Sequence, residues 1–209
     1  MSAFHHFLWV IYVLPWRALF CLMPVIAGVY LCVEVLIGAR VRLRPLWIVL
    51  FCVCLAAIIL TTVYGRETGD SAGAGFLPLF YSYKLANENP EMYRTCFMNV
   101  LLFFPAGLTL AAALRGRSKA AGGKYSRAAK RIERRPLVIC RKFLIPVAVL
   151  FCVSLVIELL QMGLGIGVAE WDDVFHNTVG ALLGSLAAAL GAILKRKYAL
   201  CRFENEPRI

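Results

Sequence analysis

The polar residues that could do chemistry are few and stand in an otherwise apolar chain. They are Asn99, Glu158, Gln161, Glu170, Asp172, Asp173, His176 and Asn177. Side chains of these types donate and accept hydrogen bonds, and a carboxylic acid can also act as a general acid or base. They therefore indicate a polar ligand-binding site. The alternative is an acid–base site in which Glu158 or Asp173 transfers the proton.

Other kinds of chemistry receive less support. His176 is a group that titrates near neutral pH, but one His among scattered carboxylates is a weak metal signature. Ser154 and Thr178 stand in apolar or packing contexts, without a G-x-S-x-G turn or an evident base. We therefore predict no metal, no cofactor and no nucleophile.

The elements that position these residues are apolar runs long enough to cross a membrane. The 209-residue chain is 61% hydrophobic, which is more apolar surface than one soluble core buries. Runs that reach the ~20 residues needed by a spanning helix lie at 18–37, 46–64, 96–114, 143–162 and 174–194. They are continuous rather than alternating, which favours an all-α integral membrane helical bundle of about five spans over a β-barrel.

Charge placement predicts the orientation of this bundle. The short first loop holds Arg40, Arg42 and Arg44, and the loop 115–142 holds eleven Lys and Arg residues against the single acid Glu133. By the positive-inside rule both loops are cytoplasmic. We expect the N-terminus outside, the C-terminus inside, and a multi-pass protein of the bacterial cytoplasmic membrane. The net charge of +11 is thereby explained without nucleic acid as a partner.

Three segments flank or join the spans. Residues 1–17 form an N-terminal interfacial segment or the start of the first span, 18–194 form the membrane domain, and 195–209 form a basic cytoplasmic tail. The basic loop 115–142 either binds anionic headgroups or only fixes the topology. The aromatic run 76–83 is too short to span, so it either lines a cleft or anchors the chain at the outer surface.

This orientation brings the polar residues of three spans to a similar depth in the outer leaflet. Pro105 should kink the third span and free backbone carbonyls one turn earlier. In the fifth span, the face of Asp173 and Asn177 continues through Gly180 and Gly184, a small-residue pattern that lets a neighbouring helix approach closely. The polar groups are therefore predicted to lie at one end of a packing contact.

Structural roles compete with functional ones at two places. Asp172 and Asp173 are favoured at the N-terminus of a helix by its dipole alone. A carboxylate inside a span costs about 2.5–3.5 kcal/mol, so Glu158 needs a partner. That partner is either structural, such as Arg17, Gln161 or Asn99, or belongs to a ligand or a proton transfer.

The same residues resemble the motifs of the VanZ-like membrane proteins. The stretch 99–107, with Asn99, Pro105 and Gly107, is similar to that family's N-x-x-L-F-x-P-x-G segment. Further matches are Glu158-x-x-Gln161 and Asp172-Asp173-x-x-x-Asn177-x-x-Gly180 with Gly184, and weaker ones are Tyr64-Gly65-Arg66 and Leu77-Pro78-Leu79-Phe80. The similarity covers most of residues 63–194.

The chain departs from the family pattern at two positions between Gln161 and the paired acids Asp172 and Asp173. The family usually has an Arg and then an Asp there, and this chain has Gly167 and Glu170 instead. Glu170 keeps the negative charge, whereas Gly167 removes a base, for which Arg66 or Arg94 could substitute.

The resemblance implies an envelope protein associated with resistance to teicoplanin-type glycopeptides in Gram-positive bacteria, and it supplies no catalytic assignment. The first hypothesis is a non-enzymatic protein that binds membrane lipids and a lipid-linked cell-wall precursor or a lipoglycopeptide at the outer leaflet. The second is an intramembrane enzyme acting on a lipid-linked precursor. The third is a small transporter or flippase, which is weakened because Glu34 is almost the only polar residue near the inner side of the spans.

Overall fold

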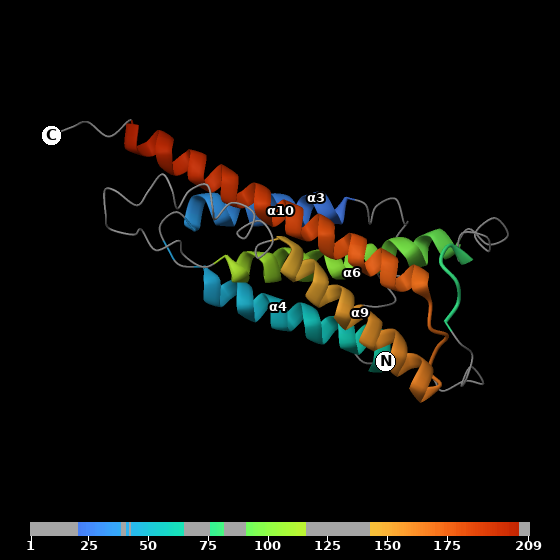
Figure 1. Ribbon diagram of the computed structural model, residues 1–209. Helices are drawn as coiled ribbons and strands as arrows, with labels where there is room; N and C mark the ends of the chain where they lie inside the picture. Colours follow the sequence, from blue (N-terminus) through green and yellow to red (C-terminus); the bar gives the residue numbers. More distant parts are fainter. Residues whose placement is uncertain are drawn as a thin grey trace, which may run out of the picture.

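The computed structural model describes residues 21–38, 41, 43–64, 76–81, 91–115 and 143–204. Their helical elements are α3 (Leu22–Cys32), the π-helical segment η1 (Val33–Ile37), α4 (Arg44–Ile59), the π-helical segment η2 (Leu60–Tyr64), α6 (Glu91–Leu114), α9 (Ile145–Leu164) and α10 (Trp171–Glu204), as Figure 1 shows. The described residues contain no strand, only an isolated bridge between Leu77 and Glu170. The predicted all-α fold is confirmed. The segment 1–17 and nearly all of the loop 115–142 lie outside the described residues.

Four of the helices are long and apolar enough to cross a membrane. They are Arg44–Tyr64, Tyr93–Leu114, Ile145–Leu164 and Trp171–Lys195, and the apolar helix Leu22–Ile37 is shorter. In hydrocarbon every backbone polar group needs an internal partner, which an α-helix provides. The chain is therefore a membrane-type helical bundle of four to five spans.

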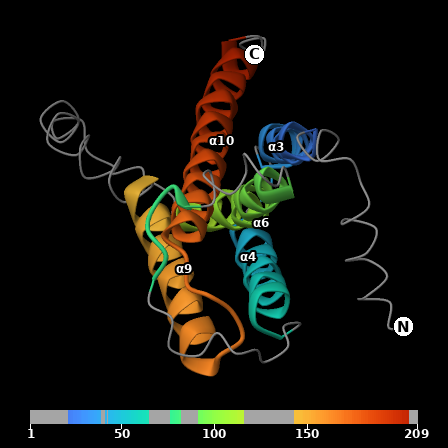
Figure 2. The ribbon, with the colours of Figure 1, turned by 90° about the vertical axis from the view of Figure 1, so that its right-hand side faces the viewer.

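The helix α6 lies at the centre of the bundle. In Figure 2, α10 and α3 lie on one side of it and α4 and α9 on the other. Within its apolar window 61% of residues are buried, against 11% for Arg44–Tyr64. Asn99, Pro105 and Gly107 therefore stand on the helix that the others pack against.

Residues at the helix ends explain where the helices begin and stop. Pro stands in the first turn of both α4 and α9, at Pro45 and Pro146, where a missing N–H costs nothing. The end of α9 is Gly165, which has a φ of 65°, and the N–H of Ile166 donates to the carbonyl of Gln161 at 3.1 Å. Such a left-handed glycine closes a helix, and it turns the chain back toward the start of α10.

The two ends of the bundle differ in charge. We call the end with Glu170, Asp172 and Asp173 the acidic end, and the end with Arg44, Arg115 and Lys195 the basic end. Beyond Lys195, α10 continues to Glu204, so the start of the expected basic tail is an extension of the last helix. Lys and Arg are good helix formers, and nothing in that stretch interrupts the helix.

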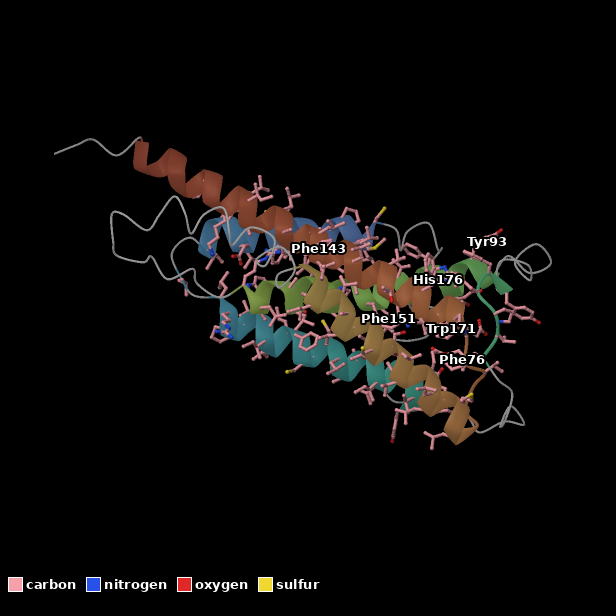
Figure 3. All side chains as sticks on the ribbon, viewed as in Figure 1. Phe76, Tyr93, Phe143, Phe151, Trp171 and His176 are labelled. Atoms are coloured by element: carbon pink, nitrogen blue, oxygen red, sulfur yellow. The ribbon has the colours of Figure 1, made fainter. Side chains whose placement is uncertain are left out.

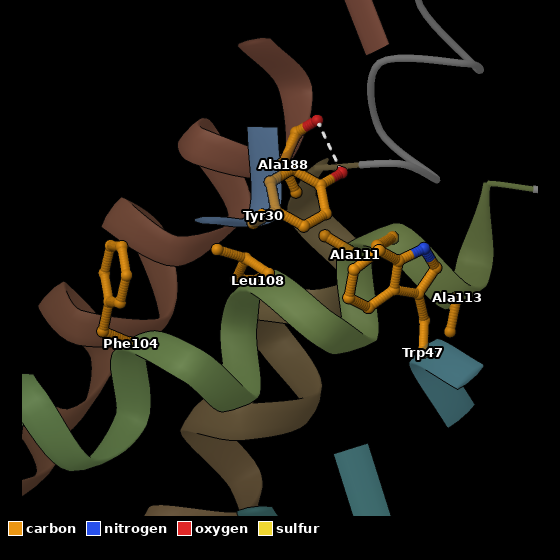
Figure 4. Packing of buried hydrophobic residues seen from close by; sticks show 8 residues of the cluster. Tyr30, Trp47, Phe104, Leu108, Ala111, Ala113 and Ala188 are labelled. Atoms are coloured by element: carbon orange, nitrogen blue, oxygen red, sulfur yellow. Dashed lines mark hydrogen bonds between the residues drawn. The ribbon is translucent and has the colours of Figure 1, made fainter. Parts of the chain in front are cut away.

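A cluster of buried side chains joins four helices near the basic end. The rings of Tyr30 and Trp47 lie 5.0 Å apart in a tilted arrangement and pack with Leu108, Ala111 and Ala188, as Figure 4 shows. The Tyr30 hydroxyl donates to the carbonyl of Ala188 at 3.4 Å. The aromatic pair ties α3 and α4 to the α6–α10 pair.

Glu34 is held by two neighbouring helices at the basic end. Lys195 forms an ion pair with it at 2.9 Å, and the indole N–H of Trp47 donates to its second oxygen at 3.1 Å. Glu34 therefore has partners on α10 and α4. A transport path would need polar residues near the inner side of the spans, and Glu34 is almost the only one the sequence offers there.

Candidate functional site

The eight candidate residues lie together at the acidic end, on three helices and one turn. Asn99 belongs to the first turns of α6, and Glu158 and Gln161 belong to the last turns of α9. Glu170 lies in the turn before α10, whose first two turns carry Asp172, Asp173, His176 and Asn177. Five side chains are at most 5% exposed: Glu158, Gln161, Asp172, His176 and Asn177. In Figure 3, His176 lies near this end of the bundle together with Trp171, Phe76 and Tyr93.

The first turn of α10 places its two acids differently. Asp172 is buried and accepts a hydrogen bond from the backbone N–H of Phe80. Phe80 has a φ of 66°, a left-handed conformation that costs a residue other than glycine about 1–2 kcal/mol. The contact with Asp172 stabilises this conformation, so one of the acids has a structural role in the segment 76–81.

The segment 76–81 lies against the turn that leads into α10. Leu77 donates from its N–H to the carbonyl of Ala169 at 2.9 Å and accepts from the N–H of Trp171 at 3.3 Å. The rings of Phe76 and Trp171 lie 4.9 Å apart. Part of the aromatic run therefore packs at the acidic end, next to the candidate residues.

Asp173 makes a contact across the bundle. The side-chain amide of Asn99 donates to its Oδ1 at 2.7 Å, which joins α6 to α10. The two residues are 74 positions apart in the sequence, and both are only partly buried. This pair is the most direct link between the N-x-x-L-F-x-P-x-G segment and the paired acids.

Glu158 is buried in the last turns of α9 and accepts a hydrogen bond from the backbone N–H of Glu170 at 3.1 Å. The turn at Gly165 brings this N–H back to the helix from which Glu158 projects. Two residues expected as its partners make other hydrogen bonds: Gln161 donates to the carbonyl of Thr62, and Asn99 donates to Asp173. Arg17 lies outside the described residues.

Two carboxamides also join helices at the acidic end. Gln161 donates to the carbonyl of Thr62 at 2.8 Å, and Asn177 donates to the hydroxyl of Ser154 at 2.9 Å. Their other atoms, Gln161 Oε1 and Asn177 Oδ1, are buried and have no hydrogen-bond partner among the described residues. More than nine in ten buried polar groups in proteins are paired, so two such oxygens at one end of the bundle are unusual.

His176 is turned toward its own helix. Its Nδ1 lies 2.5 Å from the carbonyl oxygen of Asp172, one turn earlier, so Nδ1 carries the proton and donates. The ring meets Phe175 edge-on at 5.5 Å. Within the described residues, no group of three or more His, Cys, Asp or Glu is arranged to hold a metal ion.

Glycines bring α6 and α10 into backbone contact below the polar residues. A Cβ added at Gly180 would overlap the carbonyl of Val100, and one added at Gly184 would overlap the carbonyl of Phe104. Gly107 is placed in the same way against Ala181. Only glycine permits this approach, and it holds Asn99 against Asp173.

Across Pro105 α6 stays one helix, and Thr109 donates to the Pro105 carbonyl at 2.7 Å.

Sequence reasoning missed three parts of the acidic end. The apolar context of Ser154 favours a packing role, yet its hydroxyl accepts a hydrogen bond from Asn177. The spacing i, i+4, i+7 places Ser154 on the same helical face as Glu158 and Gln161, and this is the signal that could have revealed its polar role. The backbone carbonyl of Thr62 and the backbone N–H of Phe80 leave no trace in the sequence. Arg94 stands in the first turns of α6, while Arg66 lies outside the described residues.

Comparison with known proteins agrees with these motifs. The VanZ/LLP1 family model matches residues 46–194, which is well over half of the chain and contains every residue of the acidic end. No curated protein and no solved structure matches the chain significantly. The chain belongs to the VanZ/LLP1 family.

Proposed function

We propose that this protein binds the polar head of a lipid-linked or lipophilic ligand at its acidic end, in the outer leaflet of the bacterial cytoplasmic membrane. By engaging a lipid-linked cell-wall precursor or a lipoglycopeptide there, it contributes to resistance to teicoplanin-type glycopeptides. The observation that carries the proposal is the pair of buried, unpaired oxygens of Gln161 and Asn177. A buried acceptor without a donor costs about 1–3 kcal/mol, which a ligand's donor would recover.

The two carboxamide oxygens limit which chemical groups the head of the ligand can carry. Both are acceptors, and Glu158 and Asp173 stand one turn away on the same helices, so the ligand must bring hydrogen-bond donors. Hydroxyl and amide N–H groups meet that requirement. Sugar and peptide parts of a cell-wall precursor or a glycopeptide carry such donors.

Placement at the outer leaflet follows from the charges. Arg115 and Lys195 stand at the end opposite to Asp172 and Asp173, and the loop 115–142 adds ten more bases. The positive-inside rule puts the basic end in the cytoplasm. The acidic end then faces the side where cell-wall precursors are used.

Susceptibility measurements test the proposal. We would express the protein in a susceptible Gram-positive host and compare teicoplanin susceptibility for the wild type and for Asn99→Ala, Glu158→Ala, Asp173→Ala and Asn177→Ala. Leu159→Ala, an exposed apolar position on α9, is the control, and immunoblots verify equal membrane levels. Protection by the wild type and by the control, with loss in the four others, is the expected result. No protection by the wild type would sink the resistance role.

The enzymatic alternative has one specific support, the burial of Glu158 inside the bundle. Glu158→Gln separates it from binding, because the amide keeps a hydrogen-bond acceptor and cannot transfer a proton in the same way. We expect Glu158→Gln to retain protection. Loss of protection together with a missing lipid product in extracts of that strain would favour the enzyme instead.

A further inference from the structure

Arg115 is a cation at the basic end that has donors to spare. It directly follows the last residue of α6, and its side chain is partly buried. Its Nη1 donates to the hydroxyl of Tyr30 at 3.3 Å, whereas its Nη2 is buried and has no hydrogen-bond partner among the described residues. An unpaired donor costs more to bury on a charged group than on a neutral one. The guanidinium therefore lacks an acceptor.

The nearby carboxylate of Glu34 does not supply that acceptor. One of its oxygens pairs with Lys195 at 2.9 Å, and the other accepts from the indole of Trp47 at 3.1 Å. The two positive charges of Lys195 and Arg115 thus stand against the one negative charge of Glu34, which leaves an excess of one positive charge. Burial lowers the pKa of the Arg115 guanidinium, and its neighbours Tyr30 and Glu34 offset this effect only in part. Because Arg keeps its proton in proteins, the excess charge favours an anion.

Arg115 stands at the level where the membrane spans end. The span Tyr93–Leu114 ends one residue before it, the span Trp171–Lys195 ends at Lys195, and the span Arg44–Tyr64 begins at the same end of the bundle. The anions present at that depth of a bilayer are the phosphate groups of anionic phospholipids, which basic sites at the cytoplasmic ends of helices bind. A guanidinium can hold a phosphate with two parallel hydrogen bonds.

We propose that Arg115 holds the phosphate group of an anionic phospholipid at the basic end, with Lys195 beside it as a second positive charge. This site is separate from the acidic end and does not depend on the proposed function. A soluble phosphate ester carries the same group, but lipid phosphates are concentrated where a spanning helix ends, which is the position of Arg115. The side chain is partly exposed, so a headgroup can approach it without separation of the helices.

Native mass spectrometry of the full-length protein, delipidated in dodecyl maltoside, tests the site. It measures the dissociation constant of the first bound lipid for phosphatidylglycerol and for phosphatidylcholine, whose phosphate is neutralised by choline. We expect phosphatidylglycerol to bind about tenfold more tightly. The soluble ester sn-glycerol 3-phosphate, at the same concentration, should not displace it. Displacement by this ester would overturn the lipid as the occupant, and equal binding of the two lipids would overturn the site.

A matched pair of variants locates the site. Arg115→Gln removes the charge and the paired donors, so it should abolish the preference for phosphatidylglycerol. Arg115→Lys should restore only part of it, because an ammonium cannot make the paired hydrogen bonds of a guanidinium. The control is Arg44→Gln, which removes the same charge from an exposed position at the same end of the bundle. Because solvent screens an exposed charge, Arg44→Gln should keep the preference within about twofold. Equal losses in Arg44→Gln and Arg115→Gln would reduce the effect to general charge and overturn the site.

Thermal unfolding distinguishes binding from a purely structural role of Arg115. A ligand that binds only the folded protein raises its unfolding temperature, so phosphatidylglycerol should stabilise the wild type and not Arg115→Gln. Without lipid the two proteins should unfold at similar temperatures, because the variant loses a hydrogen bond to Tyr30 but also loses an unpaired buried charge. A variant that is less stable without lipid and is still stabilised by phosphatidylglycerol would overturn the proposal. None of these measurements involves teicoplanin, so their failure leaves the proposed function standing.

Discussion

The side-chain amide of Asn177 donates to the hydroxyl of Ser154 across 2.9 Å, and this contact joins α10 to α9 inside the bundle. Ser154 is fully buried and Asn177 is 4% exposed. The same Asn177 keeps its carbonyl oxygen without a partner among the described residues. One residue therefore has both a structural contact and an acceptor that our proposal gives to the ligand.

Ser154→Ala isolates the structural part. It removes the acceptor and leaves the Asn177 amide unpaired, so we expect a loss in the free energy of unfolding of about 0.6–2 kcal/mol. Asn177→Leu combined with Ser154→Ala leaves no unpaired donor, so the double variant should be less destabilised than the sum of the singles. Denaturant unfolding in mixed micelles measures all four proteins. Strict additivity would contradict a direct contact between the two side chains.

Gly184→Ala tests the backbone contact of α6 and α10. The added methyl group would overlap the Phe104 carbonyl, so the helices must move apart, at a cost of about 1–3 kcal/mol. Gly163→Ala is the control, because a Cβ there meets nothing within 4 Å. Alanine at that position should be neutral or slightly stabilising in thermal unfolding. Equal unfolding temperatures for the two variants would refute close packing at Gly184.

The spans could be predicted from the sequence because the bilayer sets their length and composition. The continuous apolar runs identified the helices, although α6 begins at Glu91, before the expected start of that span at residue 96. The reason is physical: its first turn is polar and lies outside the hydrophobic pattern, yet it continues the helix. Hydrophobicity marks where lipid begins, and hydrogen bonding marks where a helix begins.

The site was predictable to the extent that it depends on depth. Asn99 and Asp173 are expected at the same level from topology alone, and the structure joins them at 2.7 Å. The contacts of Thr62 and Phe80 use backbone atoms, which carry no residue-type signal.

Lys195→Gln tests the ion pair at the basic end. It leaves the Glu34 carboxylate, whose side chain is 13% exposed, without its cation. Because Lys195 is 33% exposed, solvent screens the pair, and we expect a destabilisation of only about 1 kcal/mol. Glu34→Gln combined with Lys195→Gln should recover part of that loss in thermal unfolding. A double variant less stable than Lys195→Gln would show that Glu34 acts mainly through Trp47.

Asn99 and Asp173 should act as one unit in protection against teicoplanin. If the hydrogen bond positions Asp173 for the ligand, Asn99→Ala, Asp173→Ala and the double variant lose protection to the same extent, because effects within a unit are not additive. The exchanged pair Asn99→Asp with Asp173→Asn keeps one donor and one acceptor, and should restore part of the protection. Minimum inhibitory concentrations provide the comparison. Independent, additive losses would separate the two residues.

The orientation of the bundle is the remaining prediction, and cysteine labelling measures it. With the eight native cysteines replaced, a single cysteine is introduced either as Phe80→Cys at the acidic end or as Tyr198→Cys beyond the basic end. Both positions are well exposed. A membrane-impermeant maleimide should label Phe80→Cys on intact cells and Tyr198→Cys only after permeabilisation, because the basic residues keep their end in the cytoplasm. The reverse pattern would place the acidic end inside and remove the basis for a ligand from the outer leaflet.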